Sequence, residues 1–405
     1  MLPLEGIRVI DWTIWQQGPV ASSMLGDLGA DVIKIEDRVS GDPGRGIMTI
    51  LGAPVTGPGG RNYYFEMNNR NKRGMTLDLR KQRGKEIVYR LVEKSDVFVQ
   101  NFRKGVAERM GLDYATLSKY NPKLVYATGS GYGRKGPESG DPSFDYLAQA
   151  RSGIMTNQAE PGLPPTILRG AVADQTGAWC LAYGILAALV ARERLGVGQE
   201  IDGSILGGMI QFQGLGIGRY LICQDAGVRV PRKKPYNVLW NHYLCADSKW
   251  IAMGMMQPDR YWAAVCRGIG RDDMITDPKF CDMASRRENS EEVVRILDSI
   301  FATKPRDEWL KIFKEGPGEV ICGPVNDISD LINDPQVKAN DYILDFNHPV
   351  FGTIKMPGIP VGFSKTPGGV RREAPEFGQH TEEVLTEVLG LSWSEMAQLR
   401  DEEVI

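Results

Sequence analysis

Asp174 has the clearest capacity for covalent chemistry in this sequence. It stands in Ala171-Val-Ala-Asp-Gln-Thr-Gly177, immediately before a long apolar stretch that predicts a helix. A carboxylate can attack a thioester carbonyl and form an anhydride, which divides one difficult transfer into easier steps. The simpler interpretation is an N-cap, because Asp is a leading N-cap residue and favours the helix dipole. Both interpretations stay open, since a helix start also holds a side chain at a fixed, accessible position.

A second group that could bind a ligand is Gln100-Asn-Phe-Arg103, followed by Arg109. The segment comes after an expected strand, and ligands of open α/β sheets bind at strand ends. Phe can stack on a base and a guanidinium pairs with phosphate, so the set suits a nucleotide. A packed Phe beside two solvated arginines is the alternative, and the sequence leaves the two interpretations about even.

The segment Gly131-Tyr-Gly-Arg-Lys-Gly136 has the spacing of a dinucleotide fingerprint. That fingerprint requires a helix to begin at the glycines, so that its N-terminus meets the pyrophosphate. Here the glycines are followed by Pro137-Glu-Ser-Gly-Asp-Pro142, which cannot start a helix at that place. The segment therefore predicts a glycine-rich turn.

The elements that must position these residues alternate between strand and helix. Short apolar runs predict the strands, and amphipathic or apolar stretches predict the helices. Strands are expected at 7–12, 31–36, 75–79, 96–100 and 124–130, and helices at 18–28, 81–94, 175–194 and, as a continuation, 201–223. This order predicts βαβ units, a parallel sheet and right-handed crossovers.

The pattern changes after Gln224, where a basic connector with prolines begins. The elements expected beyond it are strands at 243–246 and 250–254, helices near 261–267 and 291–302, a strand–helix–strand order after 320, a strand pair at 351–360 and an acidic helix after 380. We expect a small α+β domain at 225–325, and a discontinuous large domain made of 1–224 with 326–405.

Composition limits the classes of function. The 405 residues include 48 basic and 51 acidic side chains, a balance that indicates neither a nucleic-acid nor a membrane partner. Six scattered cysteines and the lack of a signal-peptide pattern favour a cytoplasmic protein with reduced thiols. The three histidines are far apart in sequence, which disfavours a His-rich metal site or a His-dependent triad.

Taken in order, these residues resemble the class III CoA-transferase family of the CaiB-BaiF type, which includes formyl-CoA transferase. The resemblance covers essentially the whole chain. Matching segments include 4–11, 28–36, 71–78, 147–150, Asp174, 322–325 and 378–382. The resemblance implies an α/β fold with a large Rossmann-like domain built from both chain ends, a smaller α+β domain, and a dimer of two subunits interlocked as rings.

The resemblance also implies roles for single residues. Asp174 would be the nucleophile, forming an aspartyl-CoA thioester between two anhydride steps, and Gln16 would lie near the thioester. Asp145 falls where formyl-CoA transferase has a glutamate close to the catalytic carboxylate. The positions implied for the nucleotide of CoA are Leu77, Arg80, Asn101, Phe102, Arg103 and Arg109. The CoA thioester is a substrate, and neither a permanently bound cofactor nor a metal is implied.

Departures from formyl-CoA transferase bear on the substrate. Asp37 stands in place of a CoA-binding arginine, so Arg38 would have to supply that charge. Pro142 and Phe144 replace a lysine and a tyrosine, and the apolar and aromatic segment Lys234–Trp240 replaces a glycine run. We therefore expect an acceptor acid with an apolar or aromatic portion in place of oxalate or formate. The similarity of Trp15–Pro19 to subunits of succinyl-CoA:(R)-benzylsuccinate CoA-transferase, an enzyme of aromatic degradation, implies succinyl-CoA as the donor.

Two alternatives stay open. The α-methylacyl-CoA racemases share the fold, but racemization needs two positioned acid/base groups, and the segment Asp141–Asp145 lacks their histidine. The second alternative is one subunit of a hetero-oligomer, because some transferases of this type pair the catalytic chain with one that lacks the nucleophile. Asp174 argues that this chain would be the catalytic one, and leaves an unlike partner open.

Overall fold

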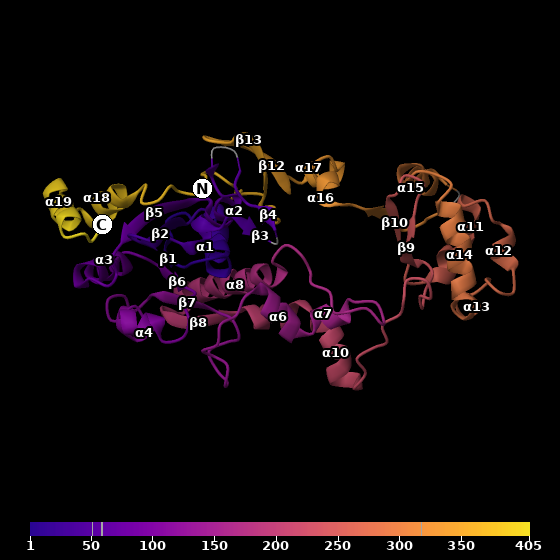
Figure 1. The fold of residues 1–405 in the computed structure, drawn as a ribbon, viewed down its shortest axis with the longest axis horizontal. Helices are drawn as coiled ribbons and strands as arrows, with labels where there is room; N and C mark the ends of the chain where they lie inside the picture. The colour runs from indigo at the N-terminus through magenta and orange to yellow at the C-terminus, as the bar shows by residue number, and fades with distance from the viewer. Residues whose placement is uncertain (51, 58–59, 317) are drawn as a thin grey trace. The chain divides into compact units, whose positions relative to one another are not determined.

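The computed structural model describes residues 1–50, 52–57, 60–316 and 318–405 (Figure 1). The chain divides into two compact units. The larger contains residues 1–156, 166–226 and 340–405, and the smaller contains 157–165 and 227–339. The smaller unit extends beyond the expected end at 325, and one reason is an ion pair of 3.0 Å between Lys249 and Asp330. Each unit is described by itself below.

The larger unit is built on a six-stranded sheet in the order β5-β2-β1-β6-β7-β8, in which every neighbouring pair is parallel. Its strands are β1 Arg8–Trp12, β2 Asp31–Asp37, β5 Lys72–Leu77, β6 Val97–Gln100, β7 Val125–Ser130 and β8 Gln199–Ser204. This is the doubly wound order, whose ligand crevice lies beyond the carboxyl ends of the strands where the order reverses. Here that switch point lies between β1 and β6. The expected parallel α/β sheet is confirmed.

Alternate residues of the strands enter two separate cores. Ile10 and Phe98 belong to the core that includes α3 (Gln82–Glu93), α18 (Thr381–Leu389) and α19 (Trp393–Asp401). Val9 and Val97 belong to the core shared with α1 (Gln17–Asp27) and α8 (Val172–Leu195). Figure 1 shows the C-terminal helices beside α3, at the β5 edge of the sheet. Burial on both faces explains the apolar runs of the strands.

The smaller unit has a three-stranded antiparallel sheet in the order β11-β10-β9. Its strands are β9 Trp240–Leu244, β10 Trp250–Gly254 and β11 Cys322–Val325. Tyr243 and Ile251 pack with Trp262 and Phe301 in one apolar core. The helices of this unit are α11 Pro258–Gly268, α12 Asp273–Thr276, α13 Met283–Glu288, α14 Ser290–Phe301, α15 Arg306–Glu315, α16 Ile328–Leu331 and α17 Pro335–Ala339.

Two expectations about elements are wrong. Residues 199–204 form strand β8 before the helices begin, because this segment pairs with β7 at the edge of the sheet. Residues 351–360 contain one strand, β13 (Gly352–Pro357), which pairs with β12 (Ile343–His348). In both wrong cases, pairing with another strand decided the structure. By contrast, the strand–helix–strand order expected after residue 320 is confirmed by β11, by α16 and α17, and by β12, and β11 pairs with β10.

The remaining elements of the larger unit are short or connect the sheet to its helices. They are the 3-10 helix Pro43–Gly46, β3 Thr49–Ile50, β4 Ala53–Pro54, α2 Tyr63–Asn69, α4 Val106–Met110, α5 Tyr114–Leu117, α6 Asp145–Ser152, α7 Ile154–Asn157, α9 Ile205–Phe212 and α10 Gly214–Cys223. Residues 131–142 form turns and bends, which confirms the glycine-rich turn. No helix among the described residues is long and apolar enough to cross a membrane.

Candidate active site

The loop that follows β1 is held at the switch point by Asn101, the first residue after β6. The Asn101 amide donates to the Ile14 carbonyl at 2.8 Å and accepts from the Ile14 amide at 2.9 Å. Trp15 has a φ of 66°, and its amide donates to Asp42 Oδ1 at 3.1 Å. Gln16 is buried and immediately precedes α1. These contacts hold the buried Gln16 between the ends of β1 and β6.

A buried ion pair holds this loop in place. Lys34 Nζ lies 2.8 Å from Asp42 Oδ2, and both side chains are fully buried. Lys34 also donates to the Thr13 carbonyl at 2.9 Å. Burial disfavours the charged ammonium, but the carboxylates of Asp42, Asp11 and Glu36 outweigh it and raise the pKa of Lys34. The pair therefore connects the end of β2 to the backbone on both sides of Ile14.

A cavity of about 310 Å³ lies beyond the carboxyl ends of β1, β2, β5 and β6. Leu77, Arg80 and Phe102 all line it, as does Trp12. The rings of Trp12 and Phe102 have centroids 4.2 Å apart. The structure thus brings three of the residues implied for nucleotide binding together, at the position where doubly wound sheets bind ligands.

The other arginines implied for CoA binding are not grouped in this cavity. Arg38 donates to the main-chain oxygen of the C-terminal Ile405 at 2.9 Å. Arg103 and Arg109 are solvent-exposed and stand outside the described lining of the cavity. Arg80 does line it, although its guanidinium pairs with the Asp78 carboxylate through hydrogen bonds of 2.8 and 3.1 Å. The charges nearest the cavity are therefore partly neutralised within the chain.

Asp174 lies in the first turn of α8 and does not cap it. The helix begins at Val172, after Ala171, whose φ of 52° places it in the left-handed region. The cap comes from another helix: Asp145 Oδ1 accepts from the amides of Ala173 at 2.7 Å and Asp174 at 3.3 Å. The N-cap interpretation of Asp174 is wrong, because a long-range carboxylate satisfies the amides that a local cap would have satisfied.

The environment of Asp174 disfavours its negative charge. Burial, and then the nearby carboxylate of Asp145, raise the pKa of Asp174 to about 7. No described residue donates a hydrogen bond to the Asp174 carboxylate. A carboxyl group with this pKa is both populated as an anion at neutral pH and poorly solvated, which suits a nucleophile or a base.

Sequence reasoning missed Tyr64, on α2. Burial, followed by the negative charges of Asp174 and Asp42, raises the pKa of the Tyr64 phenol. The phenol is therefore a neutral donor near both carboxylates. The run Tyr63-Tyr64-Phe65 marked an aromatic segment, but periodicity could not show that the Tyr64 phenol would lie near Asp174. Phe144, which precedes Asp145, meets Trp15 edge-on with centroids 6.4 Å apart.

Comparison with known proteins identifies the family of the chain. The model of CoA-transferase family III matches residues 4–381. Succinyl-CoA:glutarate CoA-transferase of Mus musculus is 34% identical, over 96% of this chain and 87% of that protein. The beta subunit of succinyl-CoA–L-malate CoA-transferase of Chloroflexus aurantiacus is 32% identical, over 100% of this chain and 98% of that protein. The crystal structure of a CAIB/BAIF family protein from Brucella suis has a TM-score of 0.84, with 28% identity, over 96% of this chain and 99% of that one.

The chain therefore belongs to CoA-transferase family III, and it is an enzyme whose substrates are CoA thioesters.

Proposed function

We propose that this enzyme moves CoA from succinyl-CoA to a carboxylic acid with an apolar or aromatic portion, through a thioester on Asp174. The observation that carries the proposal is a carboxyl group with a pKa of about 7, at the start of α8, to which no described residue donates a hydrogen bond. Two of the relatives named above are, by their names, succinyl-CoA-dependent enzymes.

The proposed reaction has four steps that balance. The Asp174 carboxylate attacks the donor thioester, and CoA leaves as its thiolate while a mixed anhydride forms. The thiolate attacks the aspartyl carbonyl, releases the donor acid and leaves an aspartyl-CoA thioester. The acceptor carboxylate attacks that thioester and gives a second anhydride and free thiolate. The thiolate then attacks the acceptor acyl carbonyl, which yields the new acyl-CoA and restores Asp174.

Surrounding residues have distinct roles in this proposal. Asp145 holds the first turn of α8 through the amides of Ala173 and Asp174. Tyr64 donates a hydrogen bond near Asp174, since its phenol stays neutral. Gln16 lies near the thioester, where an amide can hydrogen-bond the carbonyl oxygen on which charge develops.

CoA binding is proposed to use the 310 Å³ cavity for the adenine, between Leu77 and Phe102. Arg80 lies at its wall, and the exposed Arg103 and Arg109 are proposed to meet the phosphates. Asn101 contributes by clamping the β1–α1 loop, because both ends of its amide are engaged by Ile14. Arg38 would have to exchange its bond with the Ile405 main-chain oxygen for a phosphate.

A dimer, interlocked as the family resemblance implies, is part of the proposal. Helix α10 is apolar and none of its residues is buried, and Leu215, Leu221 and Ile222 are all exposed. Large apolar patches on a protein surface mark contact sites, and a second copy of this chain would cover them. An unlike partner is the alternative, since one relative is named as a beta subunit.

The direct test of the covalent step is trapping. The enzyme is incubated with succinyl-CoA and then reduced with borohydride, which converts an aspartyl thioester to an alcohol. We expect inactivation, and a mass change confined to the peptide that carries Asp174. Inactivation that requires no acyl-CoA, or modification at another carboxyl group, would contradict the assignment.

A further inference from the structure

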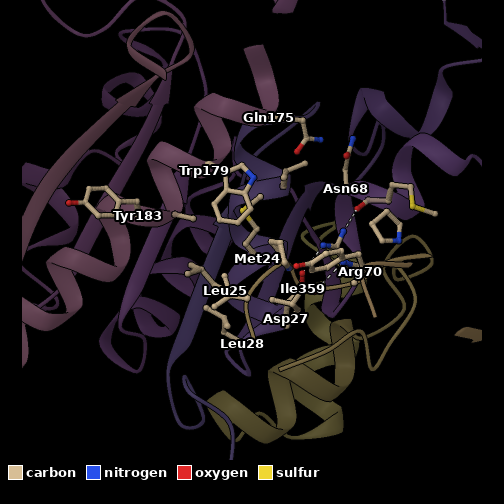
Figure 2. Close-up of a pocket in the computed structure, with 18 of the residues that line it drawn as sticks. Met24, Leu25, Asp27, Leu28, Asn68, Arg70, Gln175, Trp179, Tyr183 and Ile359 are labelled. Carbon is tan, nitrogen blue, oxygen red and sulfur yellow. Dashed lines mark hydrogen bonds and ion pairs between the residues drawn. The ribbon is translucent and has the colours of Figure 1, made fainter. Parts of the chain in front are cut away.

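A second and larger cavity, of about 820 Å³, lies in the same unit as the proposed nucleophile (Figure 2). Its walls come from α1, α2, α8 and the C-terminal segment 357–363. They are mainly apolar and include Met24, Leu25, Trp179, Leu186 and Ile359. The size and the apolar lining are those of pockets that enclose small molecules. It shares no described lining residue with the cavity that we assign to the nucleotide.

One end of this cavity carries two carboxamides. Figure 2 shows Asn68 and Gln175 at the same end, Asn68 from α2 and Gln175 from α8. Asn68 is 4% exposed, and its Nδ2 has no hydrogen-bond partner among the described residues. An unpaired buried amide costs stability, so it calls for a group that binds it in the working enzyme. A carboxylate or carbonyl oxygen is the acceptor such a donor requires.

The charged residues of the cavity are already satisfied by each other. Arg70 and Asp27 form two hydrogen bonds of 3.1 and 2.6 Å, and Arg70 also donates to the Met67 carbonyl at 2.7 Å. Their charges therefore do not select a ligand with a charge at both ends. The cavity favours a molecule that is polar at the end near Asn68 and apolar over the rest of its length.

Two helices connect this polar end to the proposed nucleophile. Gln175 directly follows Asp174 on α8. On α2, Tyr64 precedes Asn68 by four residues, and residues at that spacing lie on the same helix face. The charge of Asp174 contributes to the raised pKa of Tyr64, so the Tyr64 end of this face is near Asp174. The same face of α2 thus borders both Asp174 and the cavity.

We propose that this cavity receives the apolar body of the acceptor acid while its carboxylate is held by Asn68 and Gln175 beside Asp174. The inference rests on the proposed function and specifies its substrate class: monocarboxylic acids with a branched aliphatic or aryl body. The apolar walls between Trp179, Leu186 and Ile359 enclose that body, and the Asn68 amide donates to a carboxylate oxygen.

The first test fills the cavity. Ala182 lines it from α8, and Ala182→Phe places a ring in the space. We expect kcat/KM for 3-phenylpropanoate and 4-methylpentanoate to fall at least tenfold, with succinyl-CoA as donor, while kcat/KM for acetate changes less than twofold. The control is Val190→Phe on the same helix, at an exposed position outside the described lining, which should leave all three acids unchanged.

The second test removes the unpaired amide. Asn68→Leu should raise KM for the bulky acids about tenfold and leave KM for succinyl-CoA within twofold. Because Asn68 Nδ2 has no hydrogen-bond partner in the described part of the chain, we also expect the melting temperature to stay level or rise. A fall in melting temperature together with a uniform loss of activity would show a structural role and overturn this part of the inference.

The outcomes separate this inference from the proposed function. If the wild-type enzyme transfers CoA and forms the Asp174 adduct, but Ala182→Phe affects all acids equally or none, the cavity assignment is wrong. Equal losses together with an altered oligomeric state would mean that a second copy fills the cavity. If the wild-type enzyme forms no adduct at Asp174, the proposed function itself is wrong.

Discussion

The carboxylate of Asp145 accepts a hydrogen bond of 3.3 Å from the main-chain amide of Asp174, which brings a second negative charge to the start of α8. The same oxygen accepts from Ala173 at 2.7 Å. One side chain therefore caps the helix and also disfavours ionisation of Asp174. Its effect on the pKa comes second to burial, and together they raise that pKa to about 7.

The first prediction is a pH dependence. The anion of Asp174 is the proposed nucleophile, so kcat/KM should rise with pH and level off above about 7. Asp145→Asn removes the like charge, and the midpoint of the profile should move to lower pH. Asp141→Asn, at an exposed position shortly before α6, is the control and should not move the midpoint. An unchanged midpoint in Asp145→Asn would show that burial alone sets the pKa.

The second prediction concerns stability. The pKa of Asp174 in the folded protein is raised above its unfolded value of 3.8. The favourable contribution of this carboxyl group to the free energy of unfolding is therefore complete below about pH 4 and is lost as pH rises through 7. Asp174→Asn should therefore be more stable than wild type at pH 8, by at most about 4 kcal/mol for a shift of this size, and equally stable near pH 4. Urea unfolding at a fixed protein concentration measures this.

The transfer activity of Asp174→Asn tests the covalent role of the same side chain. Asp174→Asn should lower transfer at least a thousandfold, on the order of magnitude expected when a covalent nucleophile is lost. Circular dichroism should show an unchanged fold. A folded variant that retains more activity than this would exclude the covalent intermediate.

The third prediction concerns the buried pair under the β1–α1 loop. Asp42→Ala leaves the Lys34 ammonium buried without its partner, and removing one member of a buried pair costs about 3–5 kcal/mol. We expect that loss in the free energy of unfolding, and a higher KM for the CoA substrate because Trp15 loses the acceptor of its amide. Asp345→Ala breaks the exposed pair with Lys355 and should cost less than about 1 kcal/mol.

The fourth prediction separates the contributions of ring stacking and of charge to the binding of CoA. Phe102→Ala should weaken the binding of both CoA and adenosine, because its ring lines the proposed adenine cavity. Arg109→Ala should weaken CoA binding by about 1.5–3 kcal/mol, as expected for a charge-assisted hydrogen bond, and leave adenosine binding unchanged. Calorimetry with both ligands separates the two effects. Equal losses for both ligands in Arg109→Ala would contradict a phosphate-binding role.

The fifth prediction concerns assembly. Interlocked chains cannot separate without partial unfolding, so exchange of subunits should be as slow as unfolding. Tagged and untagged preparations, mixed in native buffer, should show no exchange over hours, and dilution should produce no folded monomer. Rapid exchange would contradict the interlocked arrangement, whether the partner is the same chain or a related one.

Much of the fold follows from local signals in the sequence. Strands such as 97–100 are apolar on both faces, which predicts a strand in a covered parallel sheet, and the structure confirms it. The sequence also predicts that Leu77 and Phe102 lie close together. Both stand at the carboxyl end of a parallel strand, and those ends meet at one edge of the sheet.

Only the tertiary structure decided the rest. Residues 199–204 form a strand because β7 offers an unpaired edge, and their sequence carries no such information. The Asp174 side chain does not cap α8, because the carboxylate of Asp145, 29 residues earlier, accepts from the amides at the start of this helix. The Asn68 Nδ2 has no hydrogen-bond partner among the described residues, and the elements around it come from distant parts of the chain. A sequence specifies which groups can interact, whereas burial and pairing depend on which distant groups the fold brings within reach.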